Sequence, residues 1–311
     1  MSHFVKNSIL GKSNLVFEIQ QSIASEGAFI YGKYDQFRPT QYSGLIEAME
    51  MFCDDIALKK DSVIKEYKSL ISNAVGDEGK LLANLIGNLR GVIGNQPEVG
   101  DKFGREATNR LNYVFTSFIK AVASVSKPLV LVIDDLQWID SASIELLKVL
   151  IKNKPKNLMF VGIHRDIDEI LGAGHPQQGE FMNFVREINA NATNITVHNL
   201  DFDSVNSLIS EVLHIPSTEA HQLTAYVNSK TQGSPLFVKE LLRTLFESDK
   251  ITFNYKQNKW QWDKSIYDAE GVAENVFDHL RQKIQSLSLS TQETLKVCYM
   301  LRKIFFLVFI A

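Results

Sequence analysis

Short apolar runs and helical periodicities alternate along the first two thirds of the chain. Residues 129–133 (LVLVI) and 158–163 (LMFVGI) are continuous apolar runs, which is typical of parallel strands buried on both faces. Residues 28–31 and 195–199 predict two further strands. Between the strands, apolar residues recur at helical spacing. This spacing predicts helices at 14–24, 42–58, 62–75, 78–93, 104–125, 141–152 (with Ser141 or Ser143 as the cap) and 177–189.

This alternation predicts an α/β fold with a parallel sheet and helices on both of its faces. After residue 200 the pattern changes to three helices at 202–214, 217–231 and 235–248, a hairpin at 251–262 and helix again at 274–300. We therefore expect three parts: an α/β domain at 1–200, a helical subdomain at 201–250 and a last part at 251–311.

Composition narrows the classes of protein that need to be considered. The 311 residues are 45% hydrophobic and 22% charged, as in ordinary globular proteins. The net charge of −3 provides no basic field, so we expect no nucleic-acid partner. The two cysteines lie far apart, which argues against a disulfide framework or a zinc site and fits a cytoplasmic protein. The apolar segment 304–311 is too short to span a membrane.

Two acidic residues, Asp134 and Asp135, end the apolar run at 129–133. Ligands of open α/β folds bind at the carboxyl edge of the sheet, where such a pair would lie. In P-loop enzymes the first acid holds Mg²⁺ and the second polarises the attacking water. A strand end followed by a solvated turn explains the same residues equally well.

A partial phosphate-binding motif, Gly11-Lys12-Ser13, precedes the first predicted helix. In the P-loop pattern GxxxxGK[ST], glycine lets the backbone wrap the phosphates, lysine reaches their oxygens and serine binds Mg²⁺. The first glycine of the pattern would fall at position 6, where Lys6 stands. The short GKS string also occurs by chance, so its place before a helix and ahead of the Asp134 strand carries the interpretation.

Two other positions have both a functional and a structural interpretation. Arg165 follows the strand at 158–163 and is placed to sense a γ-phosphate, although an ion pair with Asp166 or Asp168 at the surface also accounts for it. Pro235 follows Gly233 between two helices, where the glycine suits a helix C-cap and the proline the first turn of the next helix. That structural role is sufficient without a ligand.

Several strings together resemble the AAA-related ATPase domain of the signal-transduction ATPases with numerous domains. The resemblance runs from about residue 11 to 297, and DDLQWIDSAS at 134–143 is its most specific string. Others are GAFIYGKYDQF at 27–37, FVGIHRDIDE at 160–169 and KTQGSPLFVKELLRTLFE at 230–247. In large bacterial sensor proteins, this ATPase accompanies serine/threonine-kinase-like, GAF and histidine-kinase domains, which the resemblance implies as partners.

The resemblance implies a P-loop NTPase that binds ATP or ADP with Mg²⁺. Gly11, Lys12 and Ser13 would match the end of Walker A, and Ser13 and Asp134 would hold the metal. Asp135 and Arg165 would match catalytic positions, whereas Pro235 would match the GxP motif on the adenine side. The residues after about 280 would match the start of a winged helix.

Both ends depart from the family pattern. Of the expected apolar strand, only Phe4 and Val5 stand before Lys6, and Lys6 and Ile9 occupy expected glycine positions. We therefore expect an incomplete first strand, neighbouring strands without ladder partners and an incomplete Walker A. The expected winged helix stops after one helix. We therefore expect a chain truncated at both ends, from a disrupted or split gene.

Three functions follow from these features. The first is a signalling switch that binds ATP or ADP and hydrolyses ATP slowly. The second is a non-catalytic scaffold or remnant that binds nucleotide weakly. A DNA-binding AAA protein is the third, and the mild acidity and shortened wing argue against it.

Overall fold

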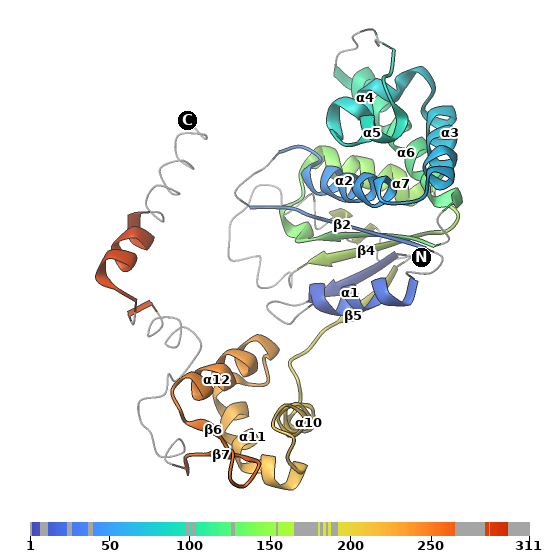
Figure 1. Ribbon diagram of the computed structural model, residues 1–311. Helices are drawn as coiled ribbons and strands as arrows, with labels where there is room; N and C mark the ends of the chain where they lie inside the picture. Colours follow the sequence, from blue (N-terminus) through green and yellow to red (C-terminus); the bar gives the residue numbers. More distant parts are fainter. Residues whose placement is uncertain are drawn as a thin grey trace. The chain divides into compact units, whose positions relative to one another are not determined.

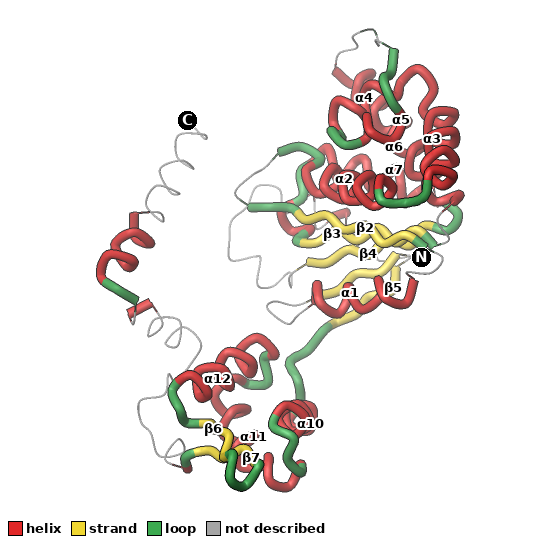
Figure 2. The backbone as a smooth tube through the Cα atoms, in the orientation of Figure 1, coloured by secondary structure: helices red, strands yellow, loops and turns green. Residues whose placement is uncertain are grey.

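A computed structural model describes most of the chain. The described residues are 2–6, 12–23, 27–36, 40–97, 100, 104–125, 128–153, 155–164, 180, 183–184, 186–187, 192–264, 284–285 and 287–297. They form two compact units. The first comprises residues 1–8 and 12–197, and the second comprises residues 9–11 and 198–311. Figure 1 labels most elements of both units, and Figure 2 also labels β3.

The first unit contains a five-stranded parallel sheet in the order β2-β3-β4-β1-β5. Its strands are β1 (Ser2–Lys6), β2 (Ala28–Lys33), β3 (Leu129–Asp134), β4 (Leu158–His164) and β5 (Ala192–Thr196). All six residues of β3 are buried, as expected for a strand covered on both faces. The predicted α/β fold with a parallel sheet is therefore confirmed.

Helices cover both faces of this sheet. The described helices of the first unit are α1 (Lys12–Ile23), α2 (Ser43–Ala57), α3 (Asp61–Val75), α4 (Gly79–Leu85), α5 (Leu89–Ile93), α6 (Gly104–Val125) and α7 (Ser141–Asn153), with short 3₁₀ turns at Gly76–Glu78 and Leu136–Trp138. Figures 1 and 2 show α2 and α7 on one face and α1 on the other. Successive strand residues alternate between these faces: Leu131 and Ile133 pack on the α2 side, whereas Val130 and Val132 pack with Val16 of α1.

Four details differ from the sequence predictions. The first strand is present as β1, five residues that pair along their whole length with β4 and β5, so the expected loss of ladder partners is wrong. The helix predicted at 78–93 is broken around Ile86, which is extended and fully buried before Gly87. The strand predicted at 195–199 is β5, three residues earlier, where it pairs with β1.

The fourth difference is the cap of α7. The carboxylate of Asp140 accepts hydrogen bonds from the backbone N–H of Ser143 (2.9 Å) and from its hydroxyl (2.5 Å). An aspartate that accepts from the third residue of a helix is a typical N-cap. Asp140 therefore caps α7, rather than Ser141 or Ser143.

The described part of the second unit contains three complete helices and a hairpin, and residues 289–297 are also helical. The complete elements are α10 (Phe202–Val212), α11 (Ser217–Thr231), α12 (Pro235–Glu247), and the antiparallel strands β6 (Ile251–Asn254) and β7 (Lys259–Trp262). Trp260 and Trp262 pack against the apolar core of these helices. Most residues of the helices predicted at 177–189 and 274–300 lie outside the described residues. The same holds for most of the expected winged helix.

Candidate nucleotide and metal site

Asp134 is the last residue of β3 and the centre of a cluster of polar side chains in the first unit. Asp134 is only 3% exposed. It follows Val132 by two positions, so it lies on the α1 face of the sheet. Ser13, in the first turn of α1, donates a hydrogen bond from Oγ to Asp134 Oδ2 at 2.6 Å. The end of β3 and the start of α1 therefore meet through these two side chains.

Lys12 begins α1 and is 9% exposed. Its Nζ donates a hydrogen bond of 2.9 Å to the carbonyl oxygen of His164, the last residue of β4. The ammonium group is thus held beside the carboxyl ends of the strands. The N-terminus of α1 lies at the same place, and helix N-termini favour anions through their backbone N–H groups and dipole.

Asp134 accepts hydrogen bonds at both carboxylate oxygens. The backbone N–H of Asp135 donates to Oδ1 at 2.7 Å. Oδ2 accepts from Tyr31 Oη at 2.8 Å as well as from Ser13. Burial, followed by the charge of Asp134, raises the pKa of the Tyr31 hydroxyl, so this group stays protonated as the donor.

Asp135 lies immediately beyond β3 in the left-handed region, with φ of 51°. Aspartate is among the residues that tolerate this conformation. Its Oδ1 accepts a hydrogen bond from Gln137 Nε2 at 2.8 Å. Its Oδ2 forms an ion pair of 3.1 Å with Lys33 Nζ from the end of β2. Both oxygens of this second carboxylate thus have protein partners.

The donor set at Asp134 suits Mg²⁺. This ion prefers oxygen ligands, and it is usually bound by one or two carboxylates together with phosphate and water oxygens. A carboxylate oxygen and a serine hydroxyl oxygen 2.6 Å apart match that chemistry. Within the described part of the chain, no three His, Cys, Asp or Glu side chains are grouped so that they could hold a metal ion by themselves. A metal here would need phosphate or water oxygens to complete its coordination.

The predicted site residues have three different outcomes. Lys12, Ser13, Asp134 and Asp135 all lie at the ends of α1 and β3 in the first unit, and Ser13 contacts Asp134 directly. Gly11 and Arg165 lie outside the described residues.

Pro235 belongs to the second unit, where it is the first residue of α12. Gly233 precedes it with φ of 73°, and a Cβ at that position would lie 1.9 Å from the carbonyl oxygen of Leu200. This close approach explains the glycine by packing. The nucleotide role of Pro235 stays a prediction.

Three members of the cluster were missed from the sequence: Tyr31, Lys33 and Gln137. Tyr31 and Lys33 alternate at the end of β2, and the register pairs Lys33 with Asp134. A polar residue on every second position of a strand end was the available signal. It could be used only once β2 was known to lie beside β3.

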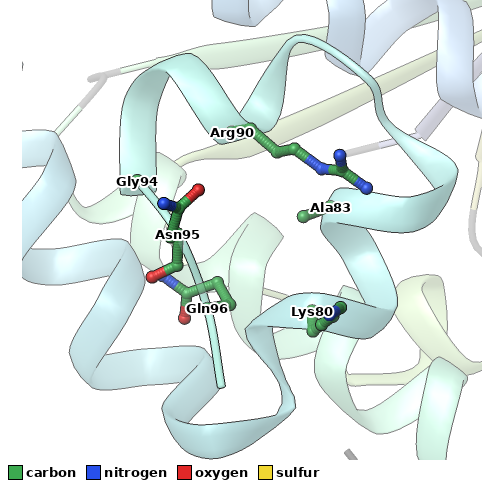
Figure 3. Close-up of a pocket in the computed structure, with 6 residues that line it drawn as sticks. All are labelled: Lys80, Ala83, Arg90, Gly94, Asn95 and Gln96. Atoms are coloured by element: carbon green, nitrogen blue, oxygen red, sulfur yellow. The ribbon is translucent and has the colours of Figure 1, made fainter. Parts of the chain in front are cut away.

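A cavity of about 180 Å³ lies elsewhere in the first unit and shares no residue with this cluster. Figure 3 shows its lining from α4, α5 and the segment that follows α5: Lys80, Ala83, Arg90, Gly94, Asn95 and Gln96. The guanidinium of Arg90 also donates a hydrogen bond to Asn84 at 3.0 Å. This cavity is not part of the candidate site.

Comparison with known proteins gives one family match. Residues 10–161 match the family described as AAA ATPase domain. This segment contains Lys12, Ser13, Asp134 and Asp135 together with the strands β2 and β3. No described helix is long and apolar enough to cross a membrane.

Two histidine kinases are similar to the chain. It is 24% identical over 341 aligned residues to "Hybrid signal transduction histidine kinase G" of Dictyostelium discoideum, which covers 92% of this chain and 10% of the relative. It is 25% identical over 183 residues to "Peroxide stress-activated histidine kinase mak3" of Schizosaccharomyces pombe, covering 58% of this chain and 7% of that protein. The chain thus spans a tenth or less of the length of these relatives.

A solved structure also aligns with the chain. "Structure of Drosophila ORC bound to GC-rich DNA and Cdc6" aligns over 86% of this chain and 84% of the solved one, with 10% identity. The TM-score is 0.31, which is too low to support a conclusion about this chain.

Proposed function

Because residues 10–161 belong to the AAA ATPase domain family, we propose that the chain is a switch module that binds ATP or ADP with Mg²⁺ and hydrolyses ATP slowly. The observation that supports this most directly is the 2.6 Å hydrogen bond between Ser13 Oγ and Asp134 Oδ2. P-loop NTPases hold Mg²⁺ between a serine or threonine of the phosphate loop and an aspartate at the end of a neighbouring strand. Here two residues 121 positions apart in sequence meet in that relation.

Each residue of the cluster has a role in this proposal. The Lys12 ammonium group would leave the His164 carbonyl for the phosphate oxygens of a nucleotide, since charged oxygens are stronger acceptors than a carbonyl. Ser13 and Asp134 would hold Mg²⁺, which supplies charge neutralisation at the phosphates. Gly11 would form part of the phosphate loop.

Asp135 would orient the attacking water, and its surroundings favour slow hydrolysis. Lys33 and Gln137 occupy both of its carboxylate oxygens. A water molecule must compete with these partners for the carboxylate. Arg165, next in sequence to β4, would stabilise charge on the transferring phosphoryl group.

The similarity to histidine kinases supports a signalling context. Because the relatives are about ten times longer than this chain, we propose that the module acts beside other domains, of kinase-like, GAF or histidine-kinase type. Its place would be the cytoplasm.

A nucleotide titration tests the proposal. We expect a fluorescent ATP analogue to bind the full chain saturably in Mg²⁺, and Lys12→Ala to weaken this binding at least about tenfold, since a charge-assisted contact to phosphate is lost. Lys65→Ala is the matched control, because Lys65 is exposed on α3 and lies outside the cluster. Circular dichroism of all three proteins checks that the variants fold.

Two results would count against the switch. Binding that is absent from the wild-type chain would favour a scaffold without nucleotide. Binding that is equal in the wild-type, Lys12→Ala and Lys65→Ala proteins would place the nucleotide away from this cluster.

A further inference from the structure

Tyr31 reaches the carboxylate of Asp134 from a different element than Ser13 does. Its Oη lies 2.8 Å from Asp134 Oδ2, and Ser13 Oγ lies 2.6 Å from the same oxygen. The backbone N–H of Asp135 holds the other oxygen at 2.7 Å. Three donors from α1, β2 and the end of β3 therefore fix one buried carboxylate.

The ring of Tyr31 is held in place independently of its hydroxyl group. It lies beside Phe17 of α1, with ring centroids 5.0 Å apart, and Phe17 also contacts Phe29 of β2 at 5.7 Å. Such tilted aromatic pairs fix ring orientation. The hydroxyl is therefore presented to Asp134 by a rigid aromatic group, with no long flexible side chain in between.

We propose that Tyr31 is a positioning residue of the metal site, whose hydroxyl holds Asp134 Oδ2 in the orientation that Mg²⁺ binding requires. The inference rests on the proposed function of the cluster. Ser13 has to offer an oxygen lone pair to the metal, so its own hydrogen bond is the one that metal binding reorganises. Toward Asp134, the Tyr31 hydroxyl acts only as a donor, so its hydrogen bond to the carboxylate can be kept when the metal binds.

This arrangement separates two parts of nucleotide affinity. Contacts from Lys12 and the N-terminus of α1 act on phosphate directly, with or without metal. The part that depends on Mg²⁺ passes through Asp134. Removal of the Tyr31 hydroxyl should therefore weaken binding in Mg²⁺ and leave binding in EDTA unchanged.

The experiment uses Tyr31→Phe, which keeps the ring and removes one oxygen atom. The dissociation constant of a fluorescent ATP analogue is measured in saturating Mg²⁺ and in EDTA, and Mn²⁺ binding to the protein–nucleotide complex is followed by electron paramagnetic resonance. Because a hydrogen bond to a charged group is lost, we expect the dissociation constant of the nucleotide in Mg²⁺ to rise about tenfold and the affinity for Mn²⁺ to fall by a similar factor.

Two controls separate positioning from packing. Tyr113→Phe removes a hydroxyl from a side chain that is 70% exposed on α6, and should match the wild type in every condition. Phe17→Leu removes the aromatic neighbour but keeps the Tyr31 hydroxyl, so it should lower thermal stability and preserve most of the Mg²⁺ dependence.

The outcomes distinguish this inference from the proposed function. If wild-type binding depends on Lys12 and Mg²⁺ but Tyr31→Phe is unchanged, the positioning role is refuted and the switch stands. Equal losses in Mg²⁺ and in EDTA would also refute it, because they indicate a general structural effect. If the wild-type chain binds neither nucleotide nor Mn²⁺, both proposals fall.

Discussion

Strand β2 and helix α2 approach each other closely at Gly32, and replacing this residue with alanine should strongly destabilise the first unit. Gly32 lies in β2 between Tyr31 and Lys33. A Cβ at this position would lie 1.8 Å from the carbonyl oxygen of Gly44 and 2.9 Å from the backbone nitrogen of Ala48, both in α2. These are backbone atoms, so no side chain can turn aside to make room.

The size of the effect follows from what α2 must do. Ordinary contact begins at 3.4 Å, so α2 would have to move away from β2 by more than an ångström. The face of α2 that would move carries Leu45, Ala48, Met49 and Phe52, all at most 1% exposed. Overpacking in a close-packed core costs about 1–3 kcal/mol and occasionally more. We expect a loss of about 3 kcal/mol or more, because a whole helix is displaced.

Urea denaturation followed by circular dichroism measures this loss, with Gly91→Ala as the matched control. Nothing lies within 4 Å of a Cβ at Gly91 in α5, so alanine there should stabilise the helix by up to about 1 kcal/mol. At a typical slope of about 2 kcal/mol per molar urea, Gly32→Ala should lower the midpoint by about 1.5 M. Hydrogen exchange should rise first in β2 and α2. If Gly32→Ala unfolds within about 0.5 kcal/mol of the wild type, the close-approach argument is wrong.

Two further predictions concern single side chains of the first unit. Burial raises the pKa of the Cys53 thiol to about 12 from an ordinary value of 9.0, so its contribution to stability is complete below pH 9 and is lost as the pH rises towards 12. In a Cys298→Ser background, Cys53 should therefore react with a thiol reagent at pH 8 only when urea unfolds the chain, and rapid reaction of the folded protein would contradict this. Lys33→Met removes the ion pair that holds Asp135, so ATP hydrolysis, measured as phosphate release, should become several-fold faster while nucleotide affinity changes little. An unchanged or lower rate would show that Lys33 does not restrain Asp135.

The central strands could be predicted because their environment is uniform. β3 and β4 are covered on both faces, so their sequences are continuous apolar runs that end one residue before each strand ends. β5 lies at the edge of the sheet, and its described side chains are exposed. Its bounds are set by pairing with β1, which an apolar pattern does not record. The break at Ile86 was missed for a similar reason, since burial of one extended residue interrupts an otherwise helical spacing.

The candidate site likewise contains residues that sequence motifs predict and residues that only the strand pairing reveals. Ser13 and Asp134 were expected to share a site because each belongs to a motif with a known geometry, and they do contact each other. Their roles toward nucleotide and metal remain predictions. Tyr31 and Lys33 belong to no such motif. Their relation to the two carboxylates depends on the parallel pairing of β2 with β3, in which Lys33 lies opposite Asp134.

Three consecutive residues of β2 connect the fold to the site. Tyr31 and Lys33 point to one face and reach Asp134 and Asp135, whereas Gly32 points to the other and admits α2. A shift of β2 by one residue would exchange these faces, placing a side chain against the Gly44 carbonyl and removing both partners from the carboxylates. Close packing of α2 therefore fixes the register that positions the two carboxylates. Substitutions on the α2 side of β2 should consequently alter metal and nucleotide binding without touching either ligand.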